Sequence, residues 1–546
     1  MYIDIVPNRK SRPAVLLRES RREGSKTHKH TVANISHWDE ARIEALKLTL
    51  AGKWDGLKPD DKKPDVPESG PIFGTLSALD QVASSIGLWQ VLGNSRNAKL
   101  IKFLILARIA HQGSRLSAVR WAKNHAVHEV LGLASFDEDD LYAAMDWLAK
   151  EQATIEDKLF EMHVKKVGHP PALVLYDVTS SYLEGELNEL AARGYNRDGK
   201  RGKLQIVIGL LTAPDGEPLA IEVFKGNTGD PKTVDAQIIK LVERFKVKEI
   251  VFVGDRGMVK AKGKETLHQH SYRYITALTD PQIRKLLKTN VLQRGLFDER
   301  IAEVQADDRR YVMYRDDSTR TKEMHRRDDK IRSLKIQVEK KNATLAKGKR
   351  AKPEKALRAM EQWAKKYRVA SFVRLTLGDR VLAFDIDAAA MEESALLDGC
   401  YVLDTDVAQN VMTKEDVNAR YRDLQKVERD FRTMKTGLLE LRPIFVRKAQ
   451  RTRAHAFVSM LGLKVARIAE QRLRKSFGTT DQDPHTDVLD DALVALSRLC
   501  ILVYTAGDER IASLPRPDAR QLQIQDALGV KIKLQTPPKA PAAAPM

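Results

Sequence analysis

Two short apolar runs, each leading into an acidic residue, constrain the fold more than any other feature of this chain. Residues 172–176 read ALVLY and precede Asp177, and residues 249–254 read EIVFVG and precede Asp255. Short apolar runs of this kind predict buried strands. An acid at the end of a strand can simply cap the next turn, because Asp, Ser and Thr favour turns and helix starts. It can also be a functional carboxylate, placed at the end of the strand to take part in a reaction. Other features of the chain have to decide between a turn cap and a functional acid.

The segments around these runs alternate between strand and helix patterns. Runs 204–211 and 219–225 flank a Pro-Asp-Gly turn and predict a hairpin. A helix is predicted from Asp230, with Pro in its first turn, and run 272–278 predicts a further strand. The order strand, hairpin, helix, strand, helix, strand predicts an α/β fold, with a mixed sheet flanked by helices.

Asp177 and Asp255 would meet in one crevice if their strands are parallel neighbours, because reactive groups of open α/β sheets gather at the carboxyl ends of strands. Neighbouring carboxylates repel each other and should share a proton or a cation. Mg²⁺ prefers oxygen ligands, and two such ions about 4 Å apart stabilise both oxygens of an in-line phosphoryl displacement. From these residues alone, a metal-dependent phosphoryl-transfer site and two unrelated turn caps both remain open.

A third candidate acid lies in residues 421–435, which read YRDLQKVERDFRTMK. Tyr421, Glu428 and Lys435 are each seven residues apart, so they share one face of a helix. Charge runs of this kind are usually salt-bridged surface helices. The alternative is a helix that lays Glu428 beside the two aspartates, with Tyr421 and Lys435 touching phosphate.

The net charge indicates the class of partner. The chain has 546 residues, with 93 Lys and Arg against 74 Asp and Glu, and a pI near 9.6. This excess favours a polyanion, most simply nucleic acid. The longest apolar stretches are too short to span a bilayer, the N-terminus lacks an apolar signal core, and two cysteines give no disulfide framework. We therefore expect a cytoplasmic protein without a membrane partner.

These motifs together resemble the DDE transposases of bacterial insertion sequences, in the cut-and-paste branch whose signature is Y-x2-R-x3-E-x6-K. Tyr421, Glu428 and Lys435 match that signature. The stretches YDVTSSYLEG, GLLTAPDGEPLAIEVFKGNT, VFVGDRGM and HTVANIS are also similar to the family, so the resemblance covers about residues 10–500.

The resemblance implies a ribonuclease-H-like core, split by an insertion between the second Asp and the Glu. It implies Asp177, Asp255 and Glu428 as the catalytic, metal-binding triad, holding two ions of Mg²⁺ (or Mn²⁺). The implied reaction is DNA strand cleavage at the element's ends and strand transfer into target DNA, in this branch often through a hairpin on the transposon end. The implied partners are double-stranded DNA, both terminal inverted repeats and target DNA, with a homodimer in the DNA complex.

The chain departs from the family pattern at two places. The arginine position of the signature holds Leu424, which removes an expected phosphate contact. Arg422 or Lys426 are the nearest substitutes, although neither has the same direction on the helix. The insertion is mostly strands in that branch, whereas here Ile331, Leu334, Val338 and Leu345 recur at helical spacing and predict a helical hairpin.

The domain organisation follows from these patterns. A hairpin at 13–35 is followed by a helix opened by Ser36 and Asp39, and a helix is predicted over about 487–504. The expected domains are an N-terminal DNA-end-binding region of hairpin and helices (1–165), the first part of the catalytic core (166–282), the insertion domain (283–400), the second part of the core (401–510) and a C-terminal tail (511–546).

DNA contacts are predicted mainly from exposed basic residues, because phosphate contact needs only an accessible Lys or Arg. The loop 194–203, GYNRDGKRGK, and the residue beside Asp255 are such positions. An aromatic residue of the insertion is a candidate for stacking on an extruded base, although helical spacing more often means packing. The candidates are Tyr421, Lys435, Arg256, Arg422, Lys200, Arg201, Lys203 and Trp363.

Two other functions stay open at this point. One is a metal-dependent nuclease with the same core that joins no strands. The other is a DNA-binding repressor derived from a transposase, against which the intact acids argue. His455 is expected to be structural, and the N-terminal reading elements are uncertain, with Arg21, His28 and Lys29 as basic candidates.

Overall fold

The computed structural model describes residues 1–8, 12–53, 67–200, 202–348, 351–442, 444–478, 488–506 and 509–534. Arg201 and the end of the predicted tail therefore lie outside the described residues. Contacts divide the chain into two compact units, one comprising Met1–Gly70 with Cys500–Pro515, the other Pro71–Leu499 with Arg516–Met546. The predicted domain boundaries remain predictions, and each unit is described by itself.

The first unit contains two small three-stranded sheets. One has the order β1-β2-β3, from β1 (Tyr2–Val6), β2 (Ala14–Glu23) and β3 (Lys26–Asn34), and is followed by α1 (Glu40–Leu50). Asp39 alone caps α1, by accepting a hydrogen bond from the backbone N–H of Arg42, so the helix starts later than the predicted Ser36. The other sheet has the order β16-β15-β4, from β4 (Glu68–Ile72), β15 (Cys500–Ala506) and β16 (Glu509–Ser513).

The predicted helix over 487–504 is wrong in its second half. α17 (Val488–Leu496) ends at Leu496, and Cys500–Ala506 is strand β15. The run CILVYTA is rich in β-branched and aromatic residues, which suit a strand, and its partner β4 is more than 400 residues earlier in the chain. A local pattern cannot reveal that partner.

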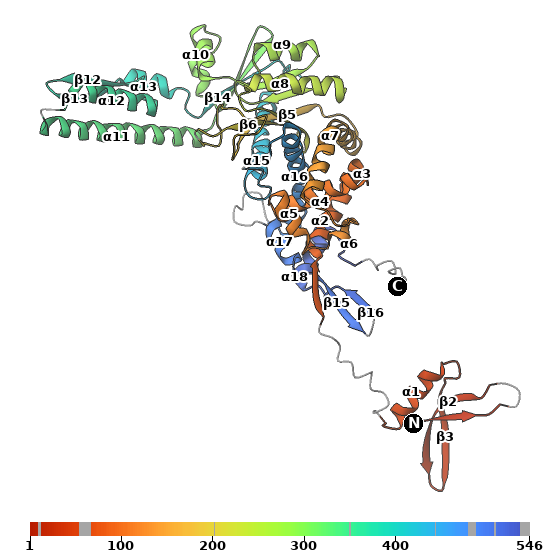
Figure 1. Cartoon of the computed structure of the whole chain (residues 1–546). Coiled ribbons are helices and arrows are strands. Elements are labelled where there is room, and N and C mark those ends of the chain that lie inside the picture. Colours follow the sequence, from red (N-terminus) through yellow and green to blue (C-terminus); the bar gives the residue numbers. More distant parts are fainter. Residues whose placement is uncertain are drawn as a thin grey trace. The chain divides into compact units, whose positions relative to one another are not determined.

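Helices form one end of the second unit (Figure 1). The long helices α7 and α16 pack on each other and on α4, and α16 is buried along most of its length. α7 begins with a capping box at Asp137, where the side chains and backbone N–H groups of Asp137 and Asp140 bond reciprocally. The helices are α2 (Gly74–Ser85), α3 (Leu88–Leu92), α4 (Arg96–Ala110), α5 (Arg115–Ala122), α6 (Val127–Leu131), α7 (Glu138–Val167) and α16 (Ala449–Phe477).

The central sheet has the strand order β10-β11-β14-β9-β8-β5-β6-β7. β5, β8 and β9 are parallel, and β6 and β7 continue from β5 as an antiparallel meander. The order β7-β6-β5-β8-β9 is that of a ribonuclease-H-like sheet, so the predicted fold class is confirmed. The strands are β5 (Leu173–Tyr182), β6 (Gln205–Thr212), β7 (Pro218–Lys225), β8 (Val251–Gly254), β9 (Arg273–Ala277), β10 (Ile301–Ala306), β11 (Arg309–Arg315) and β14 (Cys400–Thr405).

The helices that connect these strands pack on the sheet. A buried cluster that includes Tyr176, Phe252 and Tyr274 lies between the sheet and α8, α9 and α7. The connecting elements are α8 (Asp230–Ile239) with a π-helical turn (Lys240–Arg244), α9 (Ala261–Gln269), α10 (Asp280–Lys288) and a 3-10 turn (Arg294–Phe297).

Part of the predicted insertion is continuous with the central sheet, because β10 pairs with β11 and β11 pairs with β14. The rest contains the predicted helical hairpin, α11 (Asp317–Lys347) and α12 (Pro353–Tyr367), with β12 (Val373–Gly378), β13 (Val381–Ile386) and α13 (Ala388–Ala395). These elements share their own core, which includes Leu334, Val338, Met360 and Phe372. We call α11 and α12 with these elements the arm (Figure 1).

The segment predicted as a C-terminal tail contains a packed helix. Residues 519–528 form helix α18 (Ala519–Leu528), which begins with a capping box at Asp518 and Gln521. Ile524 and Leu528 are buried, and α18 contacts α16 and α17. The apolar side of this short helix is the physical reason that it packs.

Candidate active site

Asp177 and Asp255 come to neighbouring positions of the central sheet. In the parallel pair of β5 and β8, Tyr176 lies opposite Gly254, and each acid is the next residue of its chain. The prediction that the first strand ends at Asp177 is wrong, because β5 continues to Tyr182 through its pairing with β6. β8 does end at Gly254, so Asp255 lies just beyond its strand.

Glu428 comes from α15 (Leu424–Lys435), which packs on β5. Tyr421 lies on the preceding helix, α14 (Lys414–Arg422). The single helix predicted for this signature is therefore two helices, because Asp423 ends one and begins the next. Asp177, Asp255 and Glu428 all line one cavity of about 450 Å³.

Burial and neighbouring carboxylates raise the pKa values of Asp177 and Glu428. Burial, then the charge of Asp255, raises the pKa of Asp177 to about 7, with a smaller contribution from Glu428 and an opposing hydrogen bond from the backbone N–H of Val178. That N–H donates to Asp177 Oδ1 at 2.7 Å. Burial and the charge of Asp255 also raise the pKa of Glu428, which Arg432 opposes. Both shifts oppose ionisation, and a cation bound between the acids would relieve their mutual repulsion.

Tyr421 fixes one of these acids. Its Oη donates a hydrogen bond to Asp255 Oδ1 at 2.9 Å. Burial, then the charge of Asp255, raises the pKa of the Tyr421 phenol, so the phenol remains a donor at neutral pH. Its ring lies 5.7 Å from that of Tyr401. This residue of the signature orients Asp255 in the structure, which adds to the phosphate contact predicted for it.

Asp198 is a functional candidate that the sequence reasoning missed. Its side chain is 2% exposed and accepts from Lys435 Nζ at 2.7 Å and from Arg442 Nη1 at 2.6 Å. The backbone N–H of Tyr182, at the end of β5, donates to its other oxygen at 3.2 Å. Asp198 thus ties α15, which carries Glu428, to β5, which carries Asp177. The basic residues of loop 194–203 predict DNA contact, but nothing local marks its one acid as buried.

Basic residues surround the acids. Lys435 is the one predicted DNA contact that lines the cavity among the described residues, and Arg197, Arg432 and Arg442 line it without having been predicted individually. Arg197 Nη2 is 2.7 Å from both carboxylate oxygens of Asp230 at the start of α8.

The other predicted contacts lie elsewhere. Lys203 pairs with Glu184 at 2.8 Å, and Arg256 pairs with Asp280 at 3.1 Å. Lys200 lies over the ring of Tyr182, and Arg422 lies over the ring of Tyr314. Their roles in DNA binding remain predictions.

Leu424, Trp363 and His455 are packing residues in the structure. Leu424, at the arginine position of the signature, is 6% exposed, and Lys426 is held by Asp423 and the carbonyl of Pro214. Trp363 packs against the core of the arm, edge-on to Tyr367 at 5.5 Å between ring centroids. His455 is buried against Arg115 and the carbonyl of Leu441, as expected for a structural residue.

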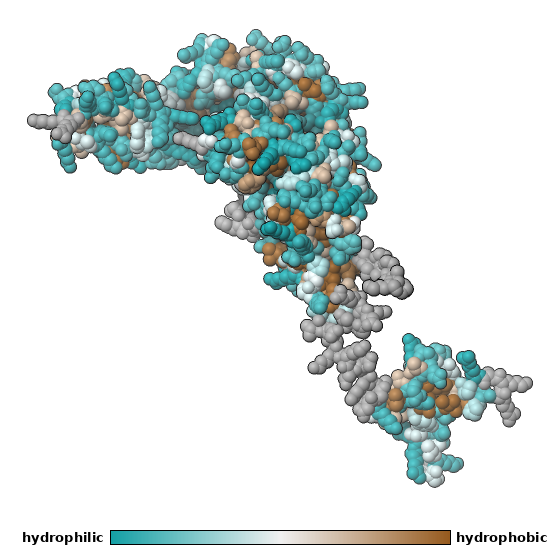
Figure 2. All heavy atoms as spheres, viewed as in Figure 1, coloured by the Kyte–Doolittle hydropathy of each residue, from teal (hydrophilic) through white to brown (hydrophobic). Residues whose placement is uncertain are grey.

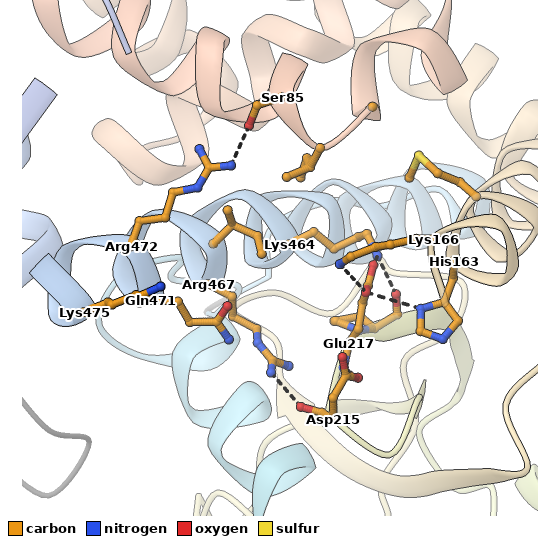
Figure 3. A pocket seen from close by; sticks show the side chains of 15 residues that line it. Ser85, His163, Lys166, Asp215, Glu217, Lys464, Arg467, Gln471, Arg472 and Lys475 are labelled. Carbon is orange, nitrogen blue, oxygen red and sulfur yellow. Dashed lines mark hydrogen bonds and ion pairs between the residues drawn. The ribbon is translucent and has the colours of Figure 1, made fainter. Parts of the chain in front are cut away.

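A second cavity, of about 700 Å³, lies between α7, α16 and the β6–β7 turn (Figure 3). Lys464 Nζ donates to Glu217 Oε1 at 2.6 Å, and His163 Nδ1 is 3.3 Å from Glu217 Oε2. Although burial opposes it, the hydrogen bond with His163 and the charge of Lys464 lower the pKa of Glu217. Because Lys464 and Glu217 neutralise each other, this group holds α7 and α16 to the sheet.

The acids of the 450 Å³ cavity fit a hard divalent cation by chemistry, because carboxylate oxygens are its preferred ligands and their mutual repulsion favours a shared cation. Among the residues that the structure describes, no three His, Cys, Asp or Glu side chains are close enough to ligate one ion together. Tyr421 already occupies one oxygen of Asp255. Metal binding would therefore require these side chains to move.

The strand order of the sheet places the chain in the ribonuclease-H-like class. Residues 168–462 match the family model described as "Transposase DDE domain", and residues 3–62 match "IS1634 family transposase, N-terminal domain". The chain belongs to the DDE transposase family, and it is a transposase of the bacterial insertion-sequence type.

Other comparisons add little. No curated protein matches the chain. Among solved structures, the chain is similar to "Cryo-EM structure of piggyBac transposase synaptic complex with hairpin DNA (SNHP)", with a TM-score of 0.34 and 9% identity over 78% of this chain and 76% of that one. Within the described residues, no helix is long and apolar enough to cross a membrane.

Proposed function

We propose that this transposase cleaves DNA strands at the ends of its element and transfers the freed 3′ ends into target DNA. Asp177, Asp255 and Glu428 would hold two divalent ions, Mg²⁺ or Mn²⁺, which when bound activate water and stabilise the leaving 3′ oxygen. The protein would act in the cytoplasm, as a homodimer on double-stranded DNA that carries the terminal inverted repeats. Catalysis would rest on positioning and electrostatics, with no covalent protein intermediate.

The residues around the acids support this proposal. Tyr421 holds Asp255 through its hydroxyl, and Asp198 holds Lys435 and the helix of Glu428 against β5. Arg432 lies at the same cavity and is exposed, so it can meet a phosphate that approaches the acids. Phosphate contacts position a DNA backbone without reading its sequence.

One observation carries the proposal: acids from β5, from the end of β8 and from α15 share one cavity, and positive side chains share its wall. This combination suits a phosphodiester, whose negative charge needs cations and whose reaction needs a metal between the acids. A buried structural ion-pair network would instead neutralise its acids, as the group around Glu217 does.

Strand cleavage of a labelled duplex that carries the element's ends tests the proposal, with Mg²⁺ or Mn²⁺ and with Glu428→Gln as the informative variant. Nicking at the repeat boundary should disappear in this variant and persist in Glu415→Gln, which removes an exposed acid from α14. Cleavage that survives in Glu428→Gln would remove this residue from the triad, and cleavage that survives in Asp177→Ala would overturn the site.

Two alternatives give different results in the same system. A nuclease that does not join strands would cleave, but it would give no joined product when supplied with pre-cleaved ends and target DNA. A repressor would bind the ends and cleave with neither metal. The raised pKa of Asp177 argues against a repressor, because a protein without metal chemistry gains nothing from keeping mutually repelling acids.

A further inference from the structure

Within the arm, α11, α12 and the loop between them carry a disproportionate share of the positive charge. Residues 317–368 contain 18 Lys or Arg and 7 Asp or Glu, a net charge of +11 out of the formal +19 of the chain. More than half of the excess therefore lies in about a tenth of the sequence, outside the candidate active site. In Figure 2, hydrophilic residues cover most of the visible face of this part.

These charges form a line on α11. Lys322, Arg326, Lys340 and Lys347 are all exposed and are separated by 4, 14 and 7 residues, so they follow one face of the helix. They span 25 residues, or about 37 Å at a rise of 1.5 Å per residue. This is close to one turn of duplex DNA, about 34 Å.

The opposite face of α11 is committed to packing. Leu334, Val338 and Leu345 are buried in the core of the arm. The fold of the arm therefore does not depend on the exposed line of charges. Lysines that only kept a helix soluble would be expected to alternate with acids, whereas this face has one acid, Asp329, which pairs with Arg332 at 3.3 Å.

The four cations have no internal partner that would explain them. In the described part of α11, ion pairs involve Asp317, Arg327, Asp329 and Arg332, and none involves the four residues of the line. The base of α11 is fixed, because Arg327 pairs with Asp398 and Glu323 Oε2 accepts from the backbone N–H of Gly399 at 2.7 Å. A fixed base and a straight row of unpaired cations suit a regular polyanion.

We propose that this face of α11 is a docking surface for the backbone of duplex DNA, separate from the acids and remote from them in sequence. The inference rests on the proposed function for its partner. Each Lys or Arg that neutralises a phosphate releases condensed counterions, so the contact would be independent of sequence and strongly dependent on salt. The surface would hold DNA that flanks the cleaved bond.

The test measures the affinity of the full-length protein for a random-sequence duplex of about 40 base pairs, by fluorescence anisotropy between about 50 and 300 mM KCl. The variant combines Lys322→Gln, Arg326→Gln, Lys340→Gln and Lys347→Gln, since Gln has a helix propensity similar to Lys. A matched control combines Lys150→Gln, Lys158→Gln, Lys262→Gln and Lys288→Gln, which removes the same charge from exposed positions of α7, α9 and α10.

The slope of log K against log salt should become shallower by about 3 to 4 in the arm variant, at about 0.9 per lost contact, and by less than about 1 in the control. Equal slopes in the two variants would overturn the surface. If the arm variant keeps the wild-type slope on DNA but no longer binds phosphatidylglycerol vesicles, the face binds membranes, and the proposed DNA surface is overturned. Wild-type binding without cleavage would reject the proposed function and leave the surface standing, whereas no duplex binding at all would reject both.

Discussion

Asp177→Asn should stabilise the metal-free protein while it abolishes metal binding. Burial and the neighbouring charge of Asp255 raise the pKa of Asp177 to about 7, whereas an unfolded chain leaves it near 3.8. The folded carboxyl therefore binds a proton more readily than the unfolded one. Between about pH 4 and 7 the folded state loses stability as the pH rises, and above the folded pKa the full penalty is present.

The size of the effect follows from that pKa. Each tenfold change in proton affinity is worth about 1.4 kcal/mol, so moving the pKa from 3.8 to about 7 disfavours the charged side chain by at most about 4 kcal/mol. Asn keeps the shape and the acceptor for the N–H of Val178, and removes the charge. The apparent melting temperature of the variant should rise by several degrees at pH 8 and be unchanged near pH 4.

Thermal melting with and without divalent metal checks both parts. Mg²⁺ at about 100 times its Kd should stabilise the wild type by about 2.7 kcal/mol and leave Asp177→Asn unmoved. Asp235→Asn, on α8 and away from the cavity, serves as the control for a lost carboxylate. The reasoning fails if the variant melts below the wild type at pH 8, or if its difference from the wild type is the same at pH 4 and pH 8.

Three further substitutions test the packing around the site. Asp198→Asn should reduce the cleavage rate more than tenfold and leave duplex affinity intact, because Lys435 and the helix of Glu428 lose their anchor. Asp198→Glu should recover part of the rate. Wild-type turnover of Asp198→Asn in a cleavage assay would reject this role. Leu424→Arg restores the signature but should not improve cleavage. It should lower the free energy of unfolding by about 2 kcal/mol or more, because the side chain at this position is 6% exposed. Thermal melting and a cleavage assay measure the two effects. Gly209→Ala would bring a Cβ to 2.2 Å from the hydroxyl of Tyr176 and should cost about 1 to 3 kcal/mol in a denaturant titration, whereas Gly295→Ala, which meets no atom within 4 Å, should be neutral.

The sequence predicts the local parts of the site better than their assembly. The runs before Asp177 and Asp255 indicate strands because their apolar patterns are local, and their parallel register then follows from the sheet. The apolar pattern does not predict the end of β5, because the residues after Asp177 form strand through pairing with β6. Pairing across the sheet is a non-local property, and polar residues such as Ser180 and Ser181 hide it.

Burial is the other property that the sequence conceals. Asp198 stands in a loop of glycines and basic residues, where an acid would ordinarily be solvated, yet two cations and a backbone N–H surround it. Likewise, Arg432 and Arg442 carry no signature, and their place at the cavity depends on how α15 docks. The spacing of Tyr421 and Glu428 correctly predicts that both lie near Asp255, although a helix boundary at Asp423 separates them.

The arm is attached at two adjacent strand ends, so it can be removed without breaking the central sheet. Arg315, at the end of β11, lies opposite Cys400, at the start of β14, so the two ends of the intervening segment are already adjacent. Replacing residues 316–399 with an Asn-Gly turn should therefore close a β-hairpin. The arm's core is separate from the cluster under the sheet, and of the cluster at β11 and β14 the removed segment contributes Leu397. The lost pairs of Glu393 with Arg284 and Arg294 are partly exposed and worth about 1 kcal/mol or less each.

The shortened protein should fold, keep its metal-dependent rise in melting temperature, and bind random duplex with a much shallower salt dependence than the full chain. Circular dichroism, thermal melting and the anisotropy titration measure these three properties, with the four-residue arm variant as the comparison. A protein that aggregates or melts without cooperativity would mean that the arm supports the catalytic sheet. An unchanged salt dependence would mean that the positive charge of the arm serves something other than DNA.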